Sequence, residues 1–125
     1  MKTFALAAML LTACGGDDGT MTMIDAPTQN MNKVQAVTCP ATADAMVTSS
    51  NTSSSYTPAS QTVAVNAIVK FVMPSTHNVA PNTLTTTDPG LSVGFGETKC
   101  LKFTQAGTFG FFCTAHSFTG TITVQ

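Results

Sequence analysis

Apolar and polar residues alternate over short runs through most of the chain, and turn-forming residues separate these runs. Six such runs predict strands, at residues 45–50, 61–65, 68–72, 99–103, 108–113 and 120–124. Many short strands with turn signals at regular spacing are typical of a β-sandwich or barrel. No segment after residue 14 shows a helical period with caps, so we expect an all-β domain.

The connections between these runs also carry predictions. Asn66-Ala67 predicts a tight turn, because Asn tolerates the left-handed region of backbone space. Residues 79–89 are rich in Thr, Asn and Pro and are expected to form a loop, and residues 91–93 are expected to pair weakly.

The run 108–113 contains Phe109, Phe111 and Cys113 at alternate positions. Because successive side chains of a strand point to opposite faces, these three share one face. We expect both Phe rings to pack in the core and the Cys113 sulfur to lie at the apolar end of the sandwich.

The first residues read as a targeting signal. Lys2 precedes an apolar stretch, 4–11, that is too short to span a bilayer. The sequence Leu11-Thr-Ala-Cys14 resembles the lipobox of bacterial lipoproteins, and the alternative is an ordinary secretory signal with a chance cysteine. The resemblance implies a signal peptide at 1–13, a lipid-modified Cys14, and anchoring to a membrane surface without a transmembrane helix. Gly15 after that cysteine favours the outer membrane, so we expect an exported periplasmic or cell-surface lipoprotein.

Residues 14–33 predict a flexible tether, and 34–125 a single domain. The tether contains Met21, Met23 and Met31, whose thioethers suit Cu(I), although a plain linker is the simpler interpretation.

Charged residues make up 9% of the chain, against about 25% in typical soluble proteins. The formal net charge is −1. This composition lacks the excess of positive charge that binds nucleic-acid phosphates, so we expect no nucleic-acid partner.

The chain has four cysteines. If Cys14 carries lipid, three thiols remain in a compartment where disulfides form, which allows one disulfide and one free thiol. Cys39 and Cys100 are the natural pair if Cys113 binds a metal. The alternative is a Cys100–Cys113 bridge without a metal, which leaves both histidines without a role.

The two histidines of the chain both stand in one pattern with Cys113. Cys113-Thr-Ala-His116 places a thiol and an imidazole on one short loop, and His77 lies 36 residues before the cysteine. One thiolate and two imidazoles form the ligand set of a trigonal copper site used for electron transfer.

Residues from about 45 to 125 resemble the cupredoxins, the plastocyanin-like blue copper proteins. The resemblance rests on spaced motifs, in order Tyr56-x-Pro58, Thr62-Val-Ala-Val, Val69-Lys-Phe, Ser75-x-His77-Asn78-Val79, Gly96-Glu-Thr98, Gly107-Thr-Phe-x-Phe-Phe-Cys113-Thr-Ala-His116 and Gly120-x-Ile-x-Val. It implies a Greek-key β-sandwich of about 7–8 strands that binds one copper ion through His77, Cys113 and His116. It also implies that Asn78 ties the two ligand loops together.

One departure from the family concerns the axial methionine that usually follows the second histidine. Here the loop reads His116-Ser-Phe-Thr119-Gly120, and no methionine occurs after Met73. Thr119 falls nearest the missing residue and is the possible axial position. The axial ligand tunes the reduction potential, so we expect a potential and a colour unlike those of a standard member.

The leading hypothesis for function is one-electron transfer between exported redox proteins, by a monomer that meets a membrane only through its lipid anchor. A copper carrier or buffer and a metal-free structural or adhesion sandwich are the alternatives, and zinc with a water ligand ranks below copper. We expect no enzyme: two histidines cannot build a second copper centre, and the domain has only three acids, Asp44, Asp88 and Glu97.

Overall fold

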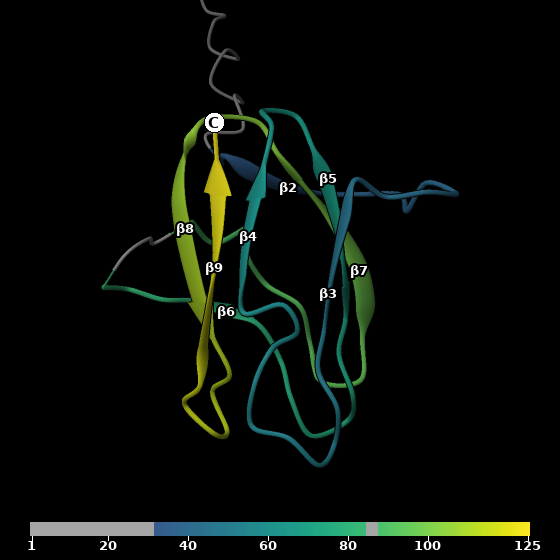
Figure 1. Ribbon diagram of the computed structural model, residues 1–125, viewed down its shortest axis with the longest axis vertical. Helices are drawn as coiled ribbons and strands as arrows, with labels where there is room; N and C mark the ends of the chain where they lie inside the picture. The colour runs from purple at the N-terminus through teal and green to yellow at the C-terminus, as the bar shows by residue number, and fades with distance from the viewer. Residues whose placement is uncertain (1–31, 85–87) are drawn as a thin grey trace, which may run out of the picture. The chain divides into compact units, whose positions relative to one another are not determined.

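Two four-stranded sheets form the domain (Figure 1). The computed structural model describes residues 32–84 and 88–125. The strands in these ranges are β2 (Val34–Val37), β3 (Ala45–Thr48), β4 (Ser60–Val63), β5 (Ile68–Val72), β6 (Ala80–Pro81), β7 (Thr98–Phe103), β8 (Gly107–Phe112) and β9 (Thr119–Val124). The predicted signal peptide, Cys14 and the tether up to residue 31 lie outside the described residues.

The chain passes repeatedly from one sheet to the other. One sheet has the strand order β2-β7-β5-β3 and the other β4-β9-β8-β6. Most neighbours are antiparallel, but β3 pairs with β5 and β4 pairs with β9 in parallel. The predicted all-β sandwich is therefore confirmed.

All six predicted strand runs correspond to observed strands, with ends that differ by one or two residues. Ile68–Val72 matches completely, and Asn66 adopts a left-handed φ of 74°, as its turn requires. The weak pairing expected at 91–93 is a single bridge between Val79 and Val93. The sequence did not predict β2, and it assigned β6 to a loop.

The core lies between the inner faces of the two sheets. Its largest fully buried side chains include Phe71, Phe103, Phe111, Leu101 and Ile122. Alternation explains the pattern: Val69 and Phe71 of β5 are buried, whereas Ile68, Lys70 and Val72 between them are only partly buried. The expected shared face of β8 is confirmed, since Phe109, Phe111 and Cys113 are all buried.

The strand registers define two ends of the sandwich. At one end, Val72 pairs with Thr98 and Phe112 pairs with Thr119. At the other, Val34 pairs with Phe103 and Gly107 with Val124. The β8–β9 loop, yellow in Figure 1, therefore lies opposite the end at which β2 begins and the chain finishes.

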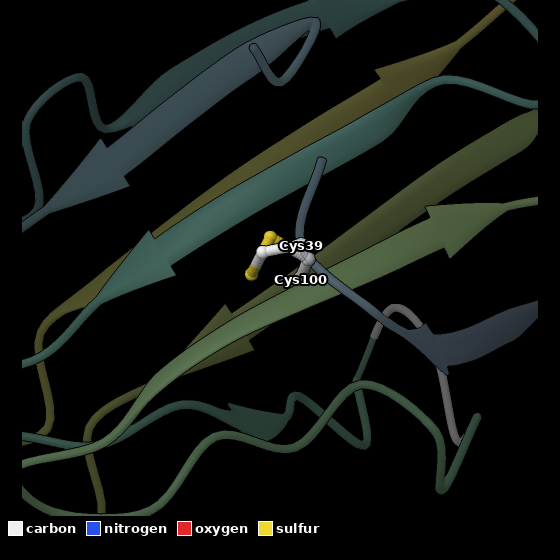
Figure 2. Close-up of a disulfide and its surroundings, with 2 residues drawn as sticks. All are labelled: Cys39 and Cys100. Atoms are coloured by element: carbon white, nitrogen blue, oxygen red, sulfur yellow. A yellow bond between two sulfur atoms is a disulfide. The ribbon is translucent and has the colours of Figure 1, made fainter. Parts of the chain in front are cut away.

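A disulfide joins Cys39, just after β2, to Cys100 in β7, as Figure 2 shows. It links residues 61 positions apart in the sequence. The alternative bridge between Cys100 and Cys113 is not formed, and Cys113 is a free, buried thiol. Within the described ranges, no helix is long and apolar enough to cross a membrane.

Candidate metal centre

Three potential metal ligands meet at the end of the sandwich where β5 and β8 finish. His77 follows β5 in a tight turn, in which its N–H donates to the carbonyl of Pro74 at 3.2 Å. Cys113 comes directly after β8, and His116 lies on the loop that leads to β9. The donor atoms of these three residues lie within 4.8 Å of one another.

Both imidazoles turn the same nitrogen toward the thiol. Nδ1 of His77 lies 3.7 Å and Nδ1 of His116 lies 3.8 Å from Cys113 Sγ. An ion bound trigonally, at about 2.3 Å from a thiolate and about 2.0 Å from an imidazole, holds sulfur and nitrogen about 3.7 Å apart. The residues present therefore fit one metal ion of the transition series.

Burial of the cluster is uneven. Cys113 is fully buried and His77 is 2% exposed, whereas His116 is exposed. The buried pair excludes water from the thiol, and the imidazole of His116 gives the site one edge at the surface. A metal ion held here would be reached from the surface through the His116 imidazole.

Backbone hydrogen bonds within the loop that carries Cys113 and His116 close this loop. Cys113 N–H donates to the carbonyl of Phe118 at 3.0 Å, and Ser117 N–H donates to the carbonyl of Cys113 at 2.8 Å. Ser117 has a φ of 63°, a left-handed conformation that is uncommon for a residue other than glycine. This turn brings Phe118 back beneath the loop.

Asn78 links the segment that carries His77 to the segment that carries Cys113. Its side-chain oxygen accepts hydrogen bonds from the N–H of Thr114, at 2.9 Å, and from the Thr114 hydroxyl, at 3.2 Å. Because Asn78 follows His77 and Thr114 follows Cys113, this contact fixes the spacing of the two ligands.

No protein-family model and no curated protein matches this chain. Among solved structures it is similar to amicyanin from Paracoccus versutus, with 21% identity over 76% of this chain and 100% of that one, and a TM-score of 0.60. It is also similar to a structure of the Cu(I) form of an amicyanin variant, with 20% identity over 75% of this chain and 100% of that one, and a TM-score of 0.60.

The described domain has the cupredoxin fold. At these identities the likeness extends to the fold and no further. Within this fold, the structure brings together the donor atoms of His77, Cys113 and His116.

Thr119, the possible axial position, is the first residue of β9. Its side chain is exposed, and the alternate residues of β9, Gly120, Ile122 and Val124, are buried. Its cross-strand partner is Phe112, which stands on the face of β8 opposite Phe111 and Cys113. This register places the Thr119 side chain on the same outer face as Phe112.

Sequence reasoning named Tyr56 only as part of a motif and missed its place beside the site. Its hydroxyl donates to the carbonyl of Asn78 at 2.6 Å, and its ring contacts Phe118. Burial raises the pKa of Tyr56 well above its usual range, and the electrostatic interaction with Cys113 raises it further. The sequence signal that could have found this role was the rarity of the residue, because Tyr56 is the one tyrosine of the chain.

Proposed function

We propose that this protein is a plastocyanin-like blue copper protein that carries single electrons between exported redox partners. The observation that carries the proposal is the convergence of two Nδ1 atoms on one buried thiol, at 3.7 and 3.8 Å. This donor set is the one that selects copper for electron transfer. The similarity to an amicyanin structure in the Cu(I) form supports copper rather than zinc.

The metal ligands in this proposal are His77, Cys113 and His116. When bound, one copper ion supplies a one-electron change between Cu(I) and Cu(II). The protein contributes a fixed frame: the Asn78–Thr114 contact and the closed loop hydrogen bonds keep the donor atoms in place. Because this frame changes little between the two oxidation states, the reorganisation energy of electron transfer stays small.

The surface around His116 favours partners that dock without charge pairing. The exposed residues of its loop, Thr114, Ala115 and Ser117, are uncharged, and partly buried Phe118 adds apolar area. We propose that a monomer presents this surface to a donor and an acceptor in turn, and that the chain is a carrier and not an enzyme.

We also propose that the protein is exported and held at a membrane surface by lipid on Cys14, with the outer membrane as the favoured location. The Cys39–Cys100 disulfide supports export, because disulfides persist in oxidising compartments.

Cyclic voltammetry of the copper-loaded protein tests the carrier role. We expect a reversible one-electron wave that persists over many cycles with one copper ion retained per chain. Loss of copper on reduction would instead support a copper buffer. A Cys113→Ser variant is the control and should lose the wave.

A further inference from the structure

His77 lacks the outer hydrogen bond that usually orients a metal-binding histidine. Its Nδ1 faces the thiol, and its Nε2 is buried with no hydrogen-bond partner in the described part of the chain. Histidine ligands generally donate their second N–H to a carboxylate, carbonyl or water, which fixes the ring. Another contact must therefore hold the His77 ring in place.

Aromatic packing supplies that contact. The ring of Phe118 stands edge-on to His77, with centroids 4.9 Å apart and planes at 87°. The same Phe118 ring lies 6.5 Å from His116 at an interplanar angle of 26°. The Phe118 ring thus lies beside both imidazoles, close to that of His77 and farther from that of His116.

Phe118 is itself supported by Tyr56. The two rings lie 4.6 Å apart, and Tyr56 also packs edge-on against Phe111 at 4.8 Å. The Tyr56 hydroxyl donates to the carbonyl of Asn78, the residue after His77. Tyr56 therefore touches the His77 segment through its hydroxyl and the His116 loop through its ring.

The room for Tyr56 is made by Gly120. A Cβ atom at this position would lie 2.5 Å from two atoms of the Phe111 ring and 3.0 Å from the Tyr56 ring. Because Gly120 has no side chain, the rings of Phe111 and Tyr56 can pack against each other, and the Tyr56 ring reaches Phe118.

We propose that Tyr56 is a positioning residue for the metal centre, acting with Phe118 in place of the missing hydrogen bond on His77. This inference rests on the proposed copper function and adds a residue and a mechanism to it. It predicts that metal retention and the electronic properties of the site depend on Tyr56, although Tyr56 binds no metal.

Two substitutions separate the two contacts of Tyr56. Tyr56→Phe removes the hydroxyl and keeps the ring, and Tyr56→Leu removes both. A Phe103→Leu variant serves as the matched control, because Phe103 is a fully buried aromatic residue at the opposite end of the sandwich. For each variant, the measurements are the rate of copper release to a chelator, the electron spin resonance spectrum, the reduction potential and the thermal stability of the metal-free protein.

We expect Tyr56→Phe to release copper about 3- to 10-fold faster than the wild type, which is the effect of one net hydrogen bond. Tyr56→Leu should release it faster still and should shift the spectrum and the potential. Phe103→Leu should lower thermal stability but leave the spectrum, the potential and the release rate unchanged.

Wild-type release, spectrum and potential in Tyr56→Leu would overturn the positioning role. The same shifts in Phe103→Leu as in Tyr56→Leu would also overturn it, because general destabilisation would then explain them. A wild-type protein that shows no thiolate–copper band at all would contradict the proposed function itself, so the two failures are distinguishable.

Discussion

Thr114 gives two hydrogen bonds to one atom of Asn78, from its backbone N–H at 2.9 Å and from its hydroxyl at 3.2 Å. The two residues are 36 positions apart in the sequence, and each follows a proposed metal ligand. This pair of bonds ties the segment of His77 to the segment of Cys113, two residues beyond the pairing of Ala80 in β6 with Phe112 in β8.

Asn78→Ala should weaken copper binding by about 10- to 100-fold. The substitution leaves the N–H of Thr114 without its acceptor, so the distance between His77 and Cys113 is no longer fixed by this contact. Competition with a chelator of known affinity measures this effect. Asn51→Ala is a matched control, since Asn51 accepts a hydrogen bond from Thr76 in an exposed loop near His77. Equal affinities in Asn78→Ala and the wild type would contradict the role given to Asn78.

Gly120→Ala should destabilise the protein by about 1–3 kcal/mol, the usual cost of overpacking a well-packed core. The added Cβ meets the rings of Phe111 and Tyr56, neither of which can move without disturbing the core. Chemical denaturation measures the change. Gly94→Ala is the control, because its Cβ would approach only the Glu97 side chain, at 3.1 Å from Oε1 and 3.9 Å from Cβ, and it should cost clearly less.

Replacing Cys39 and Cys100 together by serine should lower the free energy of unfolding by about 4 kcal/mol, the chain-entropy value for a loop of this length. The pair joins residues 61 apart, and neither contributes a donor atom to the cluster. The folded variant should therefore keep the copper spectrum of the wild type. A changed spectrum in the folded double variant would show that the disulfide acts on the site.

Thr119→Val should leave the visible and electron spin resonance spectra unchanged. The substitution keeps the shape of the side chain and removes the hydroxyl, which the register of β9 turns outward. A shift in the spectra comparable with that of a ligand substitution would mean that Thr119 does reach the metal.

Strand prediction was exact where buried and partly buried residues alternate along the strand. Ile68–Val72 alternates in this way and was predicted to the residue. The two strands that were missed have no such pattern: β2 is a four-residue edge strand, and β6 is two residues long and includes Pro81. Their pairing depends on the neighbouring strands β7 and β8 and cannot be inferred from their own residues.

The candidate ligands could be predicted because histidine and free cysteine are rare in this chain and follow a spaced motif. The surroundings of the site could not, because they depend on distances through space. The contact of Tyr56 with Phe118 joins residues far apart in the sequence, and the outward turn of Thr119 is set by its pairing with Phe112. The position of Thr119 along the loop predicted that it lies nearest the missing methionine. In the sheet, its pairing with Phe112 puts its side chain on the outer face of β9.

The central claim is that Cys113 binds copper together with His77 and His116. Its most direct test is the absorption and electron spin resonance spectrum of the Cu(II)-loaded protein, recorded beside that of Cys113→Ser. We predict an intense visible thiolate-to-copper band and a narrow hyperfine splitting, with one copper ion per chain, both lost in the variant. A wild-type spectrum without that band, or the same spectrum in both proteins, would contradict the claim.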